Sequence, residues 1–256
     1  MKRSYSNMKI AVPALVILLL CSKRLVAQDS SSTRQEVWPE LNVFYQVNNR
    51  FRVYALYSAT KLKNSSYTDG GIGIYVDYFA FPTPIIKKLG HDLRDSTSGY
   101  YVWFRVGYLY SAAPPESADP FKENTFVTEA NLRFHLPQRI LLTNKNRFDW
   151  RSIDGNFEPR YRPRLTFERN MHTKYLSYTP TIYGEYYFYL GRGGFNRFRI
   201  SAGIQVKVTE HAEIETYYVQ QFDNGKNVRG LKAMGFALKF YFRHKEVKKI
   251  LSKSDG

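Results

Sequence analysis

The chain has 256 residues, of which 38 are Lys or Arg and 22 are Asp or Glu, so its formal net charge is +16 at pH 7. An apolar content of 43% is too high for a disordered chain and predicts a folded body. The mean hydropathy is −0.44, and no apolar stretch reaches the roughly 18 to 20 residues that a spanning helix needs, which excludes a bundle of membrane helices.

The N-terminal segment has the three-part layout of a secretory signal peptide. Basic residues precede an apolar run at 10–21, and a polar stretch then ends at the small residue Ala27. We expect cleavage after Ala27, because the apolar run is too short to remain as a membrane anchor. A lipoprotein signal that uses Cys21 is the alternative, and Leu20 disfavours it because such signals place a small residue before the cysteine.

Removal of residues 1–27 changes which chemistry the chain can carry. It deletes five basic residues and no acidic ones, which leaves 16 − 5 = +11, and it deletes the only cysteine. A mature chain without cysteine has no disulfide framework, thiol nucleophile or thiolate metal site. The pI of 9.8 would fit a nucleic-acid-binding protein, but export separates the chain from cellular DNA and RNA, so we expect no nucleic-acid partner.

From residue 37 onward, apolar and polar side chains alternate with a period of two. This period is typical of strands with one apolar face, and no segment shows a helical period, so the sequence predicts an all-β protein. Eleven runs show the pattern: 37–47, 51–58, 72–78, 102–110, 126–136, 140–151, 157–169, 178–190, 197–208, 212–222 and 231–242.

The polar face of these runs favours a membrane barrel over a soluble exported β-sandwich, which would also alternate. Several arginines share that face, at 160, 162 and 164 in one run and at 197 and 199 in another, and they suit a polar lumen. Aromatic residues near the run ends suit the girdles of such a barrel. We therefore predict a single antiparallel transmembrane β-barrel over residues 28–242. Because bacterial barrels have even strand numbers, we expect about 12 strands, within about 10 to 14, with the missing one in 82–98 or 28–36.

The turns make the prediction more specific. Three hairpins are expected to have three-residue loops, at 48–50, 137–139 and 209–211, because this length keeps the apolar residues on one face. Asp154-Gly155 predicts a two-residue type I′ turn. This turn sets a register in which the numbers of paired residues sum to 309, so that Arg151 faces Glu158 and Asp149 faces Arg160.

The same register gathers charged residues on the polar side of the central hairpin. They are Lys145, Arg147, Asp149, Arg151, Glu158, Arg160, Arg162 and Arg164. Like charges face each other at 147/162 and 145/164, so we expect neighbouring acids to intervene, with Glu129, Glu168 and Glu185 as candidates. On the other side, Asn144 and Asn146 would face lipid, and a bulge or a strand end there would remove this conflict.

Three segments carry a resemblance to a known family. Arg34-Gln35-Glu36-Val37-Trp38-Pro39-Glu40-Leu41, the stretch from Leu142 to Arg151 and the stretch from Arg160 to Leu165 resemble the family catalogued as domain of unknown function 2490. The resemblance implies an exported outer-membrane barrel of a Gram-negative bacterium. No catalytic residues are established for that family, so none is carried over.

The sequence leaves three classes of function open. The first is a structural barrel or a narrow pore, in which an Arg-rich lumen either holds an internal salt-bridge network, the favoured interpretation, or binds small anions or acidic glycans. The second is an outer-membrane enzyme acting on lipid or glycan. No His is followed two residues later by Ser, and His135, near Glu129, is the first candidate base. The third is a soluble β-sandwich that binds a ligand.

No cofactor or metal site is expected, because no His and carboxylate group shows metal-ligand spacing. The C-terminal tail at 243–256 carries +3, and it would either touch anionic lipid headgroups or remain solvated. We expect outer-membrane lipid to be the main partner of the barrel.

Overall fold

The computed structural model describes residues 34–63, 68–80, 101–117, 120–174, 176–191, 195–223 and 230–244. The expected signal peptide, the stretch 82–98 and nearly all of the C-terminal tail lie outside these residues. The described chain forms strands β1 (Arg34–Gln46), β2 (Phe51–Leu62), β3 (Thr68–Phe79), β4 (Val102–Ala112), β5 (Lys122–Leu136), β6 (Ile140–Ile153), β7 (Asn156–Phe157), β8 (Arg160–Arg169), β9 (Met171–His172), β10 (Ser177–Tyr189), β11 (Phe195–Lys207), β12 (Ala212–Asp223) and β13 (Leu231–Arg243). No helix in this part is long and apolar enough to cross a membrane.

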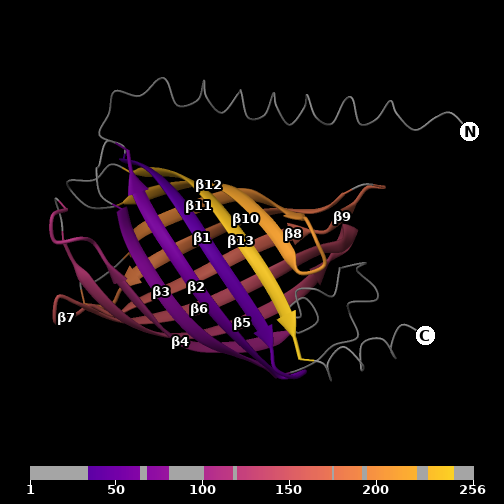
Figure 1. Ribbon diagram of the computed structural model, residues 1–256, viewed down its shortest axis with the longest axis horizontal. Coiled ribbons are helices and arrows are strands. Elements are labelled where there is room, and N and C mark those ends of the chain that lie inside the picture. Colours follow the sequence, from indigo (N-terminus) through magenta and orange to yellow (C-terminus); the bar gives the residue numbers. More distant parts are fainter. Residues whose placement is uncertain are drawn as a thin grey trace, which may run out of the picture. The chain divides into compact units, whose positions relative to one another are not determined.

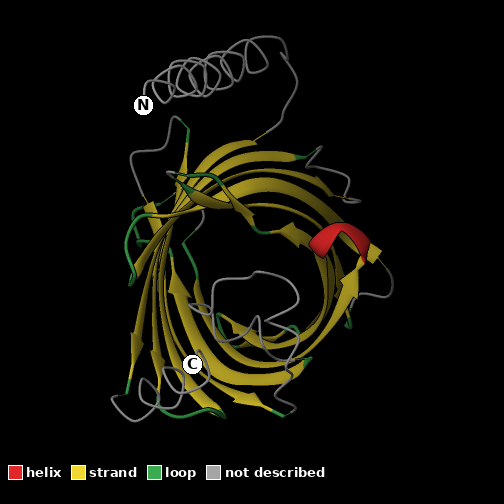
Figure 2. Ribbon diagram, turned by 90° about the vertical axis from the view of Figure 1, so that its right-hand side faces the viewer, coloured by secondary structure: helices red, strands yellow, loops and turns green. Residues whose placement is uncertain are grey.

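Eleven of the strands form a closed ring, which is visible in Figures 1 and 2. Each strand pairs with its neighbour in chain order, β10 pairs with β11, and β13 returns to β1, while β7 and β9 are short additions to hairpins. The eleven predicted runs correspond one to one to the strands of this ring. The all-β barrel is therefore confirmed, its strand number lies within the expected range, and the sandwich hypothesis is wrong because the sheet closes on itself.

The expectation of an even strand number is wrong. Successive strands alternate in direction, so the first and last strands of an eleven-stranded ring run the same way, and β1 and β13 pair in parallel from Arg34/Leu231 to Gln46/Arg243. The ring has no vacancy for a twelfth strand, because β3 and β4 pair directly, as do β13 and β1. Residues 34–36, part of one candidate region, belong to β1.

The outer face of the ring is apolar and the inner face is polar, as the alternation predicts. Along β1, Leu41 and Tyr45 are 38% and 42% exposed, whereas Asn42 and Gln46 are buried. Successive residues of a strand point to opposite sides of the sheet, so the period-two pattern assigns each side chain to the outer or the inner face. The same sorting holds from strand to strand around the ring.

The predicted turns form. The closing pairs of the three short hairpins are Val47/Phe51, Leu136/Ile140 and Val208/Ala212. Asp154 and Gly155 have φ angles of 49° and 86°, and two successive positive values are the signature of a type I′ turn. Local turn chemistry therefore sets the register of the hairpins that carry the site.

Two tyrosines inside the barrel lie flat over glycines of neighbouring strands. A Cβ on Gly107 would stand 2.2 Å from a ring carbon of Tyr75, and a Cβ on Gly235 would stand 2.0 Å from Tyr217 Cζ. The hydroxyl of Tyr217 donates a hydrogen bond to Glu40 across the β1–β13 seam, at 2.7 Å. The ring is thus held in place at both ends, and only glycine fits beneath it.

Gly235→Ala should destabilise the barrel by about 1 to 3 kcal/mol, because the new methyl group overlaps a ring that cannot move away. Gly70→Ala is the matched control within β3, since the nearest atom to its Cβ would be Ser58 O at 3.8 Å. Urea unfolding of the refolded protein in detergent micelles would measure both variants. Equal unfolding midpoints for the two would contradict the close packing at Gly235.

Candidate functional site

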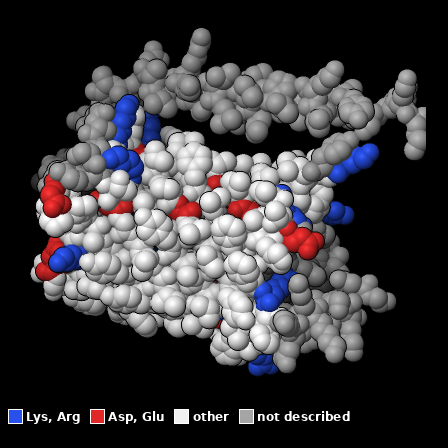
Figure 3. All heavy atoms as spheres, in the orientation of Figure 1, with Lys and Arg blue, Asp and Glu red and all other residues white. Residues whose placement is uncertain are grey.

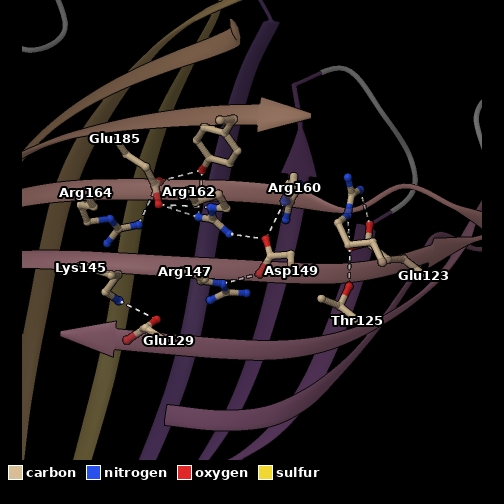
Figure 4. Close-up of polar contacts among 12 residues, drawn as sticks. Glu123, Thr125, Glu129, Lys145, Arg147, Asp149, Arg160, Arg162, Arg164 and Glu185 are labelled. Atoms are coloured by element: carbon tan, nitrogen blue, oxygen red, sulfur yellow. Dashed lines mark hydrogen bonds and ion pairs between the residues drawn. The ribbon is translucent and has the colours of Figure 1, made fainter. Parts of the chain in front are cut away.

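The central hairpin has the predicted register. Lys145 pairs with Arg164, Arg147 with Arg162, and Asp149 with Arg160, and in each pair the residue numbers sum to 309. These side chains point into the lumen, where they meet groups from β5 and β10 (Figure 4). Arg199 of β11 approaches the same group. We call this group the charged wall; its members are Glu129, Lys145, Arg147, Asp149, Arg160, Arg162, Arg164, Glu185 and Arg199.

Asp149 is the centre of one half of the charged wall. Its carboxylate accepts hydrogen bonds from Arg147 Nε at 2.5 Å, Arg160 Nε at 2.6 Å and Arg162 Nη1 at 3.3 Å. The carboxylate is fully buried. Sequence reasoning paired Asp149 with Arg160 alone, yet the same carboxylate also relieves the repulsion between Arg147 and Arg162.

Glu185 is the centre of the other half. It accepts from Arg162 Nη2 at 2.9 Å and Arg164 Nη2 at 3.0 Å, and Arg199 Nη1 lies 3.9 Å away. Lys145 pairs instead with Glu129 at 3.3 Å. Two of the three expected acids, Glu129 and Glu185, therefore neutralise the like-charged pairs. With six cations and three carboxylates, the charged wall keeps a formal charge of 6 − 3 = +3.

The guanidinium of Arg151 has an acidic partner that the central register does not predict. The backbone register is right, since Glu158 N donates to Arg151 O at 2.8 Å. The Arg151 guanidinium, however, binds both oxygens of Glu123 at 2.8 and 2.7 Å. Glu123 is near because Thr125 of β5 pairs with Arg151, whereas Glu158 follows the turn outside a regular strand. The β5–β6 register was needed to find this partner.

A buried tyrosine that sequence reasoning missed stands among the arginines. The guanidinium carbons of Arg160, Arg162, Arg197 and Arg199 lie 5.5, 4.4, 5.7 and 5.0 Å from the ring centroid of Tyr187. Its hydroxyl donates to Glu185 at 2.8 Å. The negative face of an aromatic ring attracts such cations. Residues 185 and 187 are two positions apart in β10, so the period-two pattern places Tyr187 on the same inner face as Glu185. This pattern was the one sequence signal that could have revealed Tyr187.

A second buried carboxylate cluster lies on β2, β3 and β4. Asp77 is fully buried and binds Arg52 and Arg105, each at 2.6 Å. The three residues are direct register partners, because Arg52 pairs with Asp77 and Asp77 with Arg105. Sequence analysis did not single out this cluster, because its members lie on three different strands and no local pattern brings them together.

The candidate base His135 is not joined to Glu129. The two residues lie on the same strand face six positions apart, which is roughly 20 Å along a strand. Glu129 is engaged with Lys145 and with Asn131 Nδ2 at 2.8 Å. Nothing in the described chain gathers three or more His, Cys, Asp or Glu side chains around a possible metal position.

Asn144 and Asn146 face outward, but the expected bulge or strand end is absent. β6 pairs without interruption from Ile140 to Ile153. Instead, Asn146 Nδ2 donates to Asn144 Oδ1 at 2.7 Å, and the Tyr161 hydroxyl donates to Asn146 Oδ1 at 2.6 Å. Side-chain hydrogen bonds along the wall partly satisfy the two amides and leave the strand regular.

The fold and site together define a closed β-barrel with an apolar exterior and an ion-paired lumen. The family model described as "Protein of unknown function (DUF2490)" matches residues 89–231, which is more than half of the chain and includes the central hairpin. The chain belongs to this family.

Comparison with solved structures finds the β domain of the Bordetella autotransporter Brka. It matches with a TM-score of 0.44 and 13% sequence identity, over 72% of this chain and 81% of that chain. No curated protein matches the sequence.

Asp149→Asn should destabilise the barrel by about 3 to 5 kcal/mol, because it leaves buried guanidinium groups without their carboxylate. Asp223→Asn is the matched control, since it removes a 2.5 Å pair with Arg197, whose side chain is 31% exposed. We expect a loss of about 1 kcal/mol or less there. Unfolding in detergent micelles measures both, and an equal loss would contradict a central role for Asp149.

Proposed function

We propose that this protein is an outer-membrane β-barrel with a structural role, whose lumen is closed by its own side chains. The observation that carries the proposal is the combination of an apolar exterior and an ion-paired interior around the whole ring. Ile72 and Ile74 in β3 are 63% and 60% exposed, and a soluble monomer rarely leaves so continuous an apolar surface in water. In Figure 3, the Lys and Arg side chains visible on one face gather toward the barrel ends, and the area between is mostly uncharged apart from a row of Asp and Glu atoms.

The distribution of outward aromatic rings also supports a membrane location. Aliphatic residues such as Ile74 and Val106 lie in the middle of their strands, and many of the exposed rings lie toward the strand ends, as in the aromatic girdles of membrane barrels. Among these rings are Tyr45, Phe51, Phe104 and Phe242 toward one rim, and Tyr110, Trp150 and Tyr186 toward the other; the exposed rings of Tyr57, Tyr108 and Phe236 lie in the middle of their strands. The eleven ring strands also meet the roughly 9 to 11 residues that a tilted spanning strand requires.

The charged wall supports a closed interior. Its three carboxylates are at most 1% exposed, and its cations at most 22%. Small barrels have interiors that side chains fill, and here the filling groups tie neighbouring strands together. We propose no catalytic role, because the candidate base His135 lies apart from the acid that would orient it.

A narrow anion-favouring passage is the second candidate function. The observation that favours it is the formal charge of +3 on the charged wall, which would attract small anions or acidic glycans. Arginine suits this task because its planar group binds carboxylate and phosphate oxygens in pairs.

Ile74→Arg should destabilise the membrane-inserted protein by about 2 to 4 kcal/mol, because it places a charge near the middle of the apolar band. Val47→Arg, at the end of the wall, should cost about 1 kcal/mol or less. The measurement is the heat-dependent gel migration of outer-membrane fractions from a Gram-negative host, followed over increasing urea. A soluble wild-type protein, or an Ile74→Arg variant as stable as Val47→Arg, would contradict the membrane location.

In planar bilayers, the closed lumen should give no conductance steps above the baseline of boiled protein. Replacing Arg162 and Glu185 together by serine removes a 2.9 Å pair without changing the net charge. Arg164 also loses its partner, and in a double variant that still migrates as a folded barrel the vacated space should open measurable steps. Steps from the wild-type protein with preference for chloride over potassium would reject the closed lumen and favour the anion passage.

A further inference from the structure

The outer wall carries a polar surface that the barrel itself does not fully satisfy. Asn144 and Asn146 lie on β6, and their hydrogen bonds use the Asn146 amide and the Tyr161 hydroxyl as donors. The amide nitrogen of Asn144 donates to no protein group among the described residues. Two amide N–H groups of Asn144 and one of Asn146 therefore have no acceptor among the described residues.

These amides lie near mid-depth of the wall. Asn146 is six residues from Ile140 and seven from Ile153, the two ends of β6. At the usual rise and tilt of barrel strands, it is about 15 to 18 Å from either rim, while the apolar band of such barrels is about 25 Å tall. Neither water nor lipid headgroups reach that depth. An unsatisfied amide there costs free energy, so an acceptor from another molecule is favoured.

The residues beside Asn146 leave room for such a molecule. Its register partners are Ala130 on β5 and Pro163 on β8, both smaller than the Ile74 and Val106 side chains at similar depth elsewhere. We define the amide patch as Ala130, Asn144, Asn146, Tyr161 and Pro163. A second wall can approach the backbone more closely at the amide patch than at a leucine or isoleucine surface.

We propose that the amide patch is the contact surface between two copies of this chain in the membrane. A two-fold axis brings a patch against itself, so an occupied patch must offer both donors and acceptors, and each asparagine amide offers both. Each Asn144 amide nitrogen then donates to an amide or hydroxyl oxygen of the partner copy. The inference rests on the proposed membrane location and is independent of whether the lumen conducts.

Site-directed cross-linking in outer membranes tests the contact. The chain has no cysteine after residue 21, so Ala130→Cys provides a single thiol within the amide patch, and a short bis-maleimide should yield a product of twice the chain mass. Leu41→Cys on β1 is the control, because it faces outward at similar depth on the far side of the ring. We expect Leu41→Cys to give only background.

The asparagine itself is tested in the Ala130→Cys background. Asn144→Leu should weaken association in detergent roughly ten-fold, and Asn144→Gln, which keeps an amide, should retain most of it. Heat-dependent migration of every variant reports the barrel separately, so loss of the barrel is distinguishable from loss of the contact.

Three results would overturn the proposal in protein that still migrates as a folded barrel. The first is Ala130→Cys cross-linking no better than Leu41→Cys. The second is unchanged association of Asn144→Leu. The third is a product whose mass is that of one chain plus a different protein, which would assign the patch to another partner.

Discussion

The structure depends on the neutralisation of charges that a closed sheet forces into its own interior. A ring without edges sends every second side chain of each strand inward, and here many of those side chains are guanidinium groups. A buried carboxylate is stable only with such partners, and a buried guanidinium only with such a carboxylate. Asp149 and Glu185 therefore organise three and two strongly bonded arginines respectively, and Arg162 binds both of them. Removing either carboxylate would leave charge that the lumen cannot hydrate.

Much of the fold was predictable because the information is local. The period-two pattern located all eleven ring strands, and Asp154-Gly155 set the central register without any distant contact. The errors concern features that depend on distant segments. The pairing of Arg151 with Glu123 requires the register of a different hairpin, and the cluster around Asp77 spans three strands. The odd strand number depends on how β1 meets β13, and no local pattern encodes that contact.

Asn144 and Asn146 on β6 are polar residues at positions where the period-two pattern places apolar ones. A strictly alternating strand would place apolar residues at 144 and 146, and the sequence places amides there. A bulge would have removed the conflict by turning them away from lipid. In the structure both asparagines face outward and are linked by a hydrogen bond. Their polar amides therefore lie on the outer surface, which other molecules can reach. The charged groups of the lumen are engaged in ion pairs, whereas the amide nitrogen of Asn144 on the exterior keeps its hydrogen-bonding capacity.

The parallel pairing of β1 with β13 places the first and the last residue of the ring at opposite rims. β1 begins and β13 begins at the same rim, so Arg34 and Arg243 stand at opposite rims. A barrel with an even strand number returns its last residue to the side where its first residue started. In the proposed membrane location, this eleven-stranded ring would place Arg34 on one side of the bilayer and Arg243 on the other, so that the chain from Arg34 to Arg243 would make a net crossing of the membrane.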